Sequence, residues 1–187
     1  MHLAYTPEAN ELLVADPFAL LIGMLLDQQI PMEKAFTSPN ELRARLGGAL
    51  DAATIAGYDP EAFEELFRTP PALHRFPAAM AKRVQELGRM VVSDYGGDAA
   101  AIWSEVSSGD ELVARLAKLP GFGDQKAKIF AALLGKQLSV QPPGWRQAAG
   151  PFGEDGVFRS VADVVDDSSL AKVRSYKQQV KAAAKAK

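Results

Sequence analysis

The stretch LPGFGDQKA, Leu119 to Ala127, separates two runs with helical periodicity. "DELVARLAKL" before it has one apolar face and is expected to begin at Asp110 as its cap, and "KAKIFAALL" follows it. Gly121 and Gly123 permit backbone conformations that other residues rarely adopt and let another backbone approach. The turn can therefore aim its N–H groups and those of the second helix at one point, where the helix dipole favours an anion. An ordinary tight turn would also use glycine, so both interpretations stay open.

Most of the remaining sequence is also predicted to be helical. Proline follows a helix-capping residue type at four places: Thr6-Pro7, Asp16-Pro17, Ser38-Pro39 and Asp59-Pro60. Residues 17–30 are too apolar for an exposed helix and predict a central one, whereas residues 78–95 carry a single apolar face. Residues 137–143 look extended, residues 142–156 are typical of a loop, and a last helix is predicted from about residue 168 to residue 184. The pattern predicts an all-α fold.

The composition is that of a globular protein, and it limits the cofactors that the chain can hold. Its 187 residues, 48% apolar and 24% charged, suffice for one domain over residues 1–187. Cysteine is absent, which excludes disulfides, a thiolate zinc site and an iron–sulfur cluster. The chain has only two histidines, which are too few ligands for a typical transition-metal site. We therefore expect no cofactor held by side chains. No signal-peptide pattern or long apolar run is present, so we expect a cytoplasmic protein without membrane contact.

Charge is unevenly distributed, although the formal net charge is only −2. Residues 1–70 contain 11 acids and 4 bases, whereas residues 172–187 contain 6 bases and no acid. Lysines near the end of a helix are favoured by the helix dipole and often form only a solvated face. A basic run can equally contact the phosphates of a nucleic acid. Both interpretations of the basic end stay open.

The stretch Leu119–Ala127 resembles the helix-hairpin-helix of the HhH-GPD superfamily of base-excision DNA glycosylases, which includes the endonuclease III, adenine glycosylase and alkylpurine glycosylase families. Residues 16–36 are similar to the family's buried second helix with its glutamine-bearing turn, and residues 76–97 to the segment before the hairpin. The chain looks closest to a small actinobacterial-type branch without an iron–sulfur cluster. The resemblance implies a two-lobed all-α fold, with lobes at about 17–135 and at 1–16 plus 136–187 that meet in a cleft. It also implies a monomer that binds duplex DNA and is associated with the nucleoid.

The resemblance further assigns DNA contact to Gly121, Gly123, Gln125, Gln28 and Gln29. We also expect two lysines after the hairpin, Lys126 and Lys128, to assist in holding the duplex. The two glycines and the N–H of Gln125 would hold a phosphate, and main-chain carbonyls of the hairpin would offer a site to a monovalent cation. Gln28 and Gln29 match the turn that enters the duplex, where an amide can fill the space of an extruded nucleotide. A polar helix end would carry the same two glutamines, which is the alternative interpretation.

Two positions depart from the family's catalytic pattern. Bifunctional members have a nucleophilic lysine where this chain has Gln125, and Lys126 should point elsewhere because one residue turns a helix by about 100°. Active members also carry an aspartate at the position of Gln141, if the preceding loop is two residues shorter. An amide cannot stabilise a developing cation as a carboxylate does, nor act as a base. The candidate replacements are Asp27, Glu154 and Asp155, and the alternative for each is surface charge.

Three functions are compatible with these features. The first is a base-excision-repair protein of DNA glycosylase type that binds duplex DNA and, if active, removes a base without lyase activity. The second is a catalytically silent module that recognises damaged or bent DNA, which Gln141 favours. The third is a helical domain for protein contacts, which the acidic first 70 residues favour. His74, Trp145 and Phe152 are expected to pack in the structure rather than to act on DNA.

Overall fold

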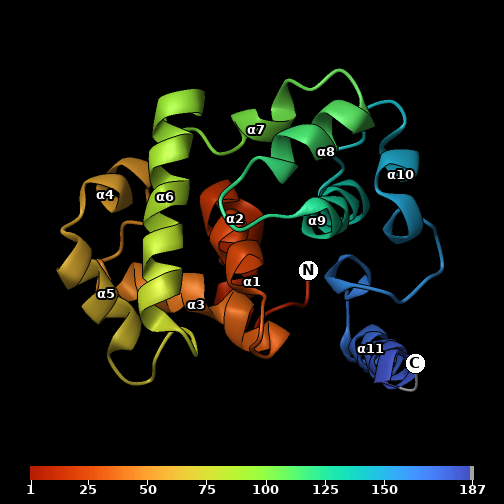
Figure 1. Ribbon diagram of the computed structural model, residues 1–187, viewed down its shortest axis with the longest axis horizontal. Coiled ribbons are helices and arrows are strands. Elements are labelled where there is room, and N and C mark those ends of the chain that lie inside the picture. Colours follow the sequence, from red (N-terminus) through yellow and green to blue (C-terminus); the bar gives the residue numbers. More distant parts are fainter. Residues whose placement is uncertain (186–187) are drawn as a thin grey trace. The chain divides into compact units, whose positions relative to one another are not determined.

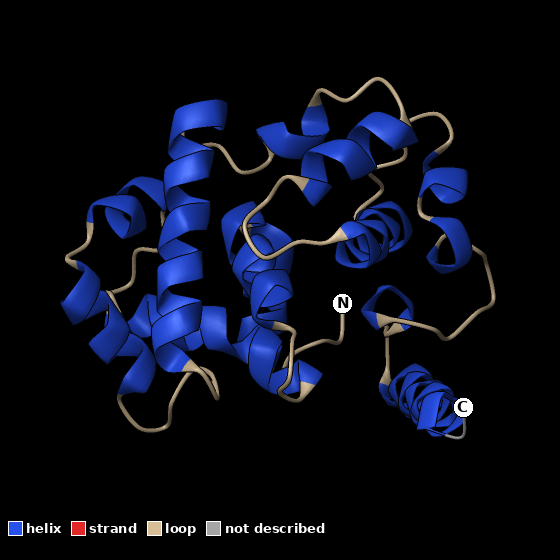
Figure 2. Ribbon diagram, in the orientation of Figure 1, coloured by secondary structure: helices blue, strands red, loops and turns tan. Residues whose placement is uncertain are grey.

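The computed structural model describes residues 1–185, which form helices joined by loops without any strand in that range (Figures 1 and 2). The expected all-α class is confirmed. The helices are α1 (Pro7–Ala15), α2 (Pro17–Leu26), α3 (Met32–Arg45), α4 (Ala52–Gly57), α5 (Pro60–Arg68), α6 (Pro77–Tyr95), α7 (Ala101–Ser104), α8 (Gly109–Ala117), α9 (Asp124–Gln137), α10 (Trp145–Ala148) and α11 (Asp167–Lys185), with 3-10 turns η1 (Gly150–Phe152) and η2 (Val161–Asp163).

The described residues form two compact units. The N-terminal unit comprises Leu3–Glu105 and the turn Lys118–Phe122, and the C-terminal unit comprises Met1–His2, Val106–Ala117 and the chain from Gly123. These units place α8 and α9 with the later part of the chain, whereas the lobes expected from the sequence place them in the first lobe. That division into lobes, and the cleft between them, stay predictions.

The core of the N-terminal unit is built around α2, whose residues Phe18–Leu26 are all buried. Helices α1 and α3 pack against α2, and α4 and α5 pack against α6. Figure 1 shows α6 running between the α4–α5 pair and α2. The predicted central helix is thus confirmed. Taken singly, none of the helices in residues 1–185 is long and apolar enough to cross a membrane; α1 and α2 reach that length and composition only as a pair, which is bent by 116°.

Three of the four predicted Pro-marked helix starts are confirmed, and the fourth is wrong. Thr6, Asp16 and Asp59 cap α1, α2 and α5, each with proline at the start of the helix. Ser38-Pro39 instead lies inside α3. The Ser38 hydroxyl is fully buried and donates to the carbonyl oxygens of residues 34 and 73, each at 2.8 Å. Tertiary packing therefore carries the helix through a proline that removes one of its backbone hydrogen bonds.

The C-terminal unit is centred on α9, against which α8, α10 and η2 pack. Trp145 is buried, and a Cβ on Gly135 would lie 2.4 Å from its ring. Helix α10 can approach α9 so closely only because residue 135 is glycine. The core role expected for Trp145 is confirmed, and Phe152 is half-buried in η1. The stretch expected to be one loop therefore contains two short helical turns, α10 and η1.

Candidate nucleic-acid interface

The sequence LPGFGDQKA connects two helices, as predicted: α8 ends at Ala117, and α9 begins at Asp124, within the stretch. The expected Asp110 cap of α8 is wrong, since the hydroxyl oxygen of Ser108 accepts the N–H of Glu111 at 3.1 Å. The Glu111 carboxylate in turn accepts the N–H and the hydroxyl of Ser107 and an N–H of Arg115. These hydrogen bonds, the one from the Ser107 N–H first, lower the pKa of Glu111 to about 2. The start of α8 is therefore held by an ionised carboxylate at neutral pH.

The turn Lys118–Phe122 is tightly fixed within the N-terminal unit. The N–H of Phe122 donates to the carbonyl of Leu119 at 3.0 Å, and both side chains are buried. Gly121 has φ +78°, and a Cβ there would lie 2.8 Å from Cδ1 of Leu25 and 3.6 Å from Cδ of Arg83. Both the left-handed backbone and the close approach to α2 therefore require glycine at this position.

Gly123 plays a different part from Gly121. Its backbone is extended, with φ −95° and ψ 177°, and a Cβ there would meet no described atom within 4 Å. It is the N-cap of α9 and provides no side-chain hydrogen bond, whereas Asp16 caps α2 through its carboxylate. The N–H groups in the first turn of a helix have no partner inside the helix, and the dipole there attracts anions. The fold itself therefore has no steric need for glycine at 123.

The first turns of α9 carry both signs of charge. Nζ of Lys128 lies 2.8 Å from Oδ2 of Asp124, whose side chain is 75% exposed. An exposed pair of this kind contributes only a few tenths of a kcal/mol, so a phosphate can replace Asp124 as the partner of Lys128. Gln125 is exposed at the second helical position, and Lys126 is half-buried. DNA contact by these three residues, Gln125, Lys126 and Lys128, stays a prediction.

The two glutamines after α2 differ in their surroundings. The Gln28 amide donates to the carbonyl of Leu25 at 2.8 Å, and its oxygen accepts an N–H of Arg83 at 3.2 Å. Gln28 is therefore a residue that fixes the turn. Gln29 is exposed and has φ +58°, a left-handed conformation that is uncommon outside glycine and is often found at functional sites. Of the two amides, that of Gln29 is the better placed to reach a ligand.

Two residues that support this surface were not among the site residues predicted from the sequence, although His74 was expected to pack in the structure. Arg83 on α6 bonds Gln28 and also lies beside Gly121, so it connects the glutamine turn with the hairpin turn inside one unit. His74 is 2% exposed; its Nδ1 accepts the N–H of Phe76 at 3.0 Å, so Nε2 carries the proton that is donated to the carbonyl of Gln28. No sequence motif marks either residue, because their contacts depend on how distant segments pack.

The residue expected at the position of the family's aspartate has a structural contact of its own. Gln141 lies in the C-terminal unit, and its amide donates to the carbonyl of Gly135 at 2.8 Å. Carbonyls in the last turn of a helix have no partner inside it, so Gln141 satisfies one at the end of α9. A carboxylate has no proton to donate there at neutral pH. The amide at 141 therefore stabilises the end of the hairpin's second helix.

The acids proposed as replacements lie in different surroundings. Asp27 is the half-buried C-cap residue of α2, and its N–H donates to the carbonyl of Gly23 at 3.1 Å. Glu154 pairs with Arg159 at 2.9 Å and Asp155 with Arg146 at 2.7 Å, both with exposed carboxylates, which favours surface charge for these two. Within residues 1–185, no three His, Asp or Glu side chains come together as a metal site would require.

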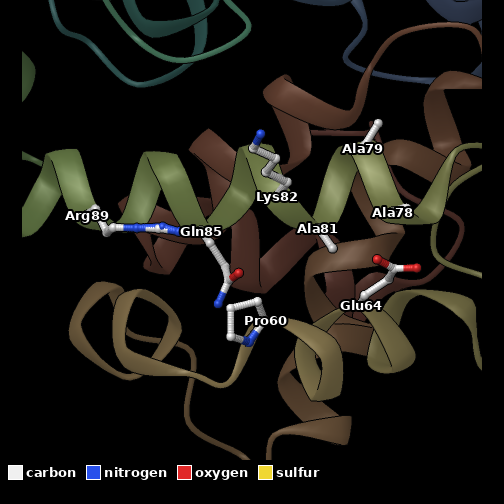
Figure 3. Close-up of a pocket in the computed structure, with 8 residues that line it drawn as sticks. All are labelled: Pro60, Glu64, Ala78, Ala79, Ala81, Lys82, Gln85 and Arg89. Carbon is white, nitrogen blue, oxygen red and sulfur yellow. The ribbon is translucent and has the colours of Figure 1, made fainter.

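The N-terminal unit also has a pocket of about 540 Å³ between α5 and α6 (Figure 3). Its lining includes Pro60, three alanines and two exposed cations, Lys82 and Arg89. Figure 3 shows Gln85 extending from α6 toward Pro60. The amide of this buried residue donates to the carbonyls of Ile55 and Tyr58, at 3.3 and 2.9 Å. Gln85 thus serves to hold α4 and the start of α5 against α6.

Comparison with known proteins agrees with the fold and the hairpin. Residues 22–186 match the family described as HhH-GPD superfamily base excision DNA repair protein. The match includes Gln28, Gln29, both hairpin glycines and Gln141. None of the curated proteins matches the chain significantly. Since the family match covers most of its length, the chain belongs to the HhH-GPD superfamily of base excision DNA repair proteins.

Proposed function

We propose that the protein binds duplex DNA through its helix-hairpin-helix and acts in base-excision repair as a monofunctional DNA glycosylase. The observation that carries the proposal is the start of α9, where Gly123 provides no side-chain cap and leaves room for an acceptor from outside. A DNA phosphate suits that position because it is an anion with several acceptor oxygens. Family membership supports the same glycosylase-like, DNA-binding role. We further propose a cytoplasmic monomer that needs no cofactor held by side chains, with room for a monovalent cation at the hairpin carbonyls.

Replacing Gly123 with leucine is expected to weaken duplex binding about tenfold, whatever the sequence of the duplex. The new side chain would occupy the position proposed for a phosphate, and each lost phosphate contact lowers the slope of log K against log salt by about 0.9. Fluorescence anisotropy with a 20-base-pair duplex at several NaCl concentrations measures both effects.

The matched control for this substitution is Gly57→Leu. Gly57 is exposed at the end of α4, and a Cβ there also meets no described atom within 4 Å. This variant should bind like the parent. Circular dichroism melts should show both variants folded, with Gly123→Leu losing no more than about 1 kcal/mol as a poorer N-cap. A folded Gly123→Leu protein with parental affinity would show that the hairpin does not hold a phosphate.

Borohydride is expected to trap no covalent adduct between the protein and abasic DNA. A lyase needs an amine that forms a Schiff base with the sugar, and Gln125 has only an amide where the family's lysine would be. Denaturing electrophoresis after borohydride treatment measures the adduct. The variant Gln125→Lys restores the amine at the same helical position and shows whether the sugar can reach it. A trapped adduct with the parent protein would contradict the assignment as monofunctional.

A second candidate is a catalytically silent protein that recognises damaged or bent DNA. The contact of Gln141 favours it, because an amide that closes the end of α9 takes the position of the family's carboxylate. A panel of duplexes with uracil, oxidised purine, alkylated purine or a mismatch separates the two candidates. Alkali after incubation reveals abasic sites if a base has been removed, whereas damage-selective binding without abasic sites supports the silent protein.

A further inference from the structure

A shallow groove of about 370 Å³ lies between residues 157–159 and α11, inside the C-terminal unit. Its lining includes two aromatic rings, Phe158 and Tyr176, and two cations, Arg159 and Lys172. Ser175 and Gln179 add a hydroxyl and an amide on the face of α11 that borders the groove. Neither the hairpin nor the glutamine turn contributes to this lining.

Both walls of the groove are fixed by hydrogen bonds. Asp163 accepts the N–H groups of Arg159 and Ser160 at 2.9 and 3.1 Å, which holds the loop wall. On the helix wall, Oδ1 of Asp166 accepts the N–H of Ser169 at 2.7 Å, and the bonds from Ser169 hold the pKa of Asp166 below its usual value. The groove is therefore present before any ligand binds.

The groove offers stacking surface and positive charge side by side. Tyr176 is 37% exposed and lies one helical turn after Lys172. Nζ of Lys172 lies over the ring of Phe158, 4.4 Å from the centre of the ring. Exposed aromatic rings beside cations are the combination that single-stranded nucleic acids use, with bases on the rings and phosphates on the cations. An unpaired nucleotide carries a base and a phosphate within one residue, so it could contact a ring and a cation at once.

A basic stripe runs along α11 on the side of the helix that faces away from the groove. Arg174, Lys177 and Lys181 are exposed and spaced by three and four residues, so they share one face of the helix. The sequence after Asp167 contains six bases and no acid. In total the C-terminal unit has 12 bases and 8 acids, whereas the N-terminal unit has 9 bases and 15 acids. A polyanion is thus attracted to the unit that contains the groove.

A membrane is a poorer occupant for this helix than a nucleic acid. Helices that lie in a membrane surface carry a broad face of Leu, Phe or Trp. The exposed large apolar residues of α11 are Tyr176 and Val180, among the residues that the structure describes. The apolar area is therefore small, while the charge is large.

We propose that the groove binds an unpaired nucleotide of a DNA strand, with its base against Tyr176 and a neighbouring phosphate at Lys172. The proposal extends the proposed function by a second DNA contact and does not require base removal. A protein that binds a duplex at its hairpin would thereby also hold a strand that has come out of base pairing.

The test measures the anisotropy of a labelled 12-nucleotide oligothymidine with the full chain. Tyr176→Ala is expected to weaken binding about tenfold, and Tyr176→Phe should restore it because stacking needs the ring and not the hydroxyl. Lys172→Gln should reduce the salt slope by about 0.7, the value for one phosphate contact in a single strand. The matched control is Lys82→Gln, which removes one exposed charge from α6 and should leave the slope unchanged.

Each outcome decides the proposal. Parental binding by Tyr176→Ala and by Lys172→Gln would overturn it, and so would binding to phosphatidylserine vesicles in place of the oligonucleotide. The hairpin variant Gly123→Leu should keep its affinity for the oligonucleotide while losing affinity for duplex DNA. If Gly123→Leu lost affinity equally for both ligands, the oligonucleotide would bind at the hairpin and the groove proposal would be overturned. If Gly123→Leu bound duplex DNA like the parent, only the proposed function of the hairpin would be contradicted.

Discussion

Replacing Asp163 with alanine is expected to lower the free energy of unfolding by about 3–5 kcal/mol. The Asp163 carboxylate is 4% exposed and lies 2.6 Å from Nζ of Lys136, itself only 13% exposed. The same carboxylate accepts the N–H groups of Arg159 and Ser160 in a capping box at the start of η2. Alanine would leave a buried ammonium without its counter-charge and two N–H groups without their acceptor. Urea denaturation followed by circular dichroism measures the loss.

The control for this prediction is an ion pair in the same unit with the opposite exposure. Asp155 pairs with Arg146, but its carboxylate is 78% exposed. Water solvates both charges once such a pair is broken, so Asp155→Ala should cost less than about 1 kcal/mol. The variant Asp163→Asn keeps an acceptor for the N–H groups and should lose less than Asp163→Ala. If the two alanine variants lost equal stability, Asp163 would not be the buried anchor of η2.

The local elements of the fold could be predicted because their causes are local. A central helix was predicted from residues 17–30, most of which are apolar, and the observed helix α2 is buried from Phe18 to Leu26. The start of α5 was predicted because Asp59 can reach the N–H of Ala62 and proline needs no such bond. Residues within a few positions of each other determine both features, so the sequence pattern is sufficient.

The prediction of a helix start at Ser38-Pro39 failed because a distant residue determines the outcome. Its hydroxyl bonds the carbonyl of Leu73, which is 35 residues away in the chain. In isolation, serine before proline favours a helix start, but burial of α3 against its neighbours outweighs that preference. The same limit explains why Arg83 was missed, since its contact with Gln28 spans 55 residues.

The sequence proposes residues for the candidate site but does not separate their tasks. Gln28 and Gln29 are adjacent and chemically identical, yet Gln28 is bonded to Arg83 and the Leu25 carbonyl whereas Gln29 is exposed with a left-handed backbone. Gly121 and Gly123 likewise look equivalent, although only Gly121 needs glycine for the fold. Gln28 and Gly121 have structural contacts with α6 and α2, which the sequence alone does not show. Within residues 1–185, Gln29 and Gly123 lack such contacts and are the two residues proposed to meet DNA.

If the protein releases bases, replacing Asp27 with asparagine is expected to lower turnover at least about a hundredfold. A carboxylate beside the sugar stabilises the positive charge of the transition state, and losing such a group costs a few kcal/mol. Asp27 is our first candidate because it immediately precedes Gln28 and Gln29, which form the turn proposed to enter the duplex. It is also half-buried at the C-terminal end of α2, whereas Glu154 and Asp155 are exposed and paired with arginines.

The measurement is single-turnover base release, read as alkali-sensitive sites, together with duplex affinity from anisotropy. Asparagine has nearly the shape of aspartate, so affinity should stay nearly unchanged while the chemical step slows. Asp94→Asn, which neutralises an exposed acid near the end of α6, is the matched control and should react at the parental rate. Parental turnover by Asp27→Asn would exclude Asp27, and the carboxylate that stabilises the sugar would then have to come from another position. A parallel loss of affinity and turnover would instead assign Asp27 to the shape of the glutamine turn, because binding and chemistry would then fail together.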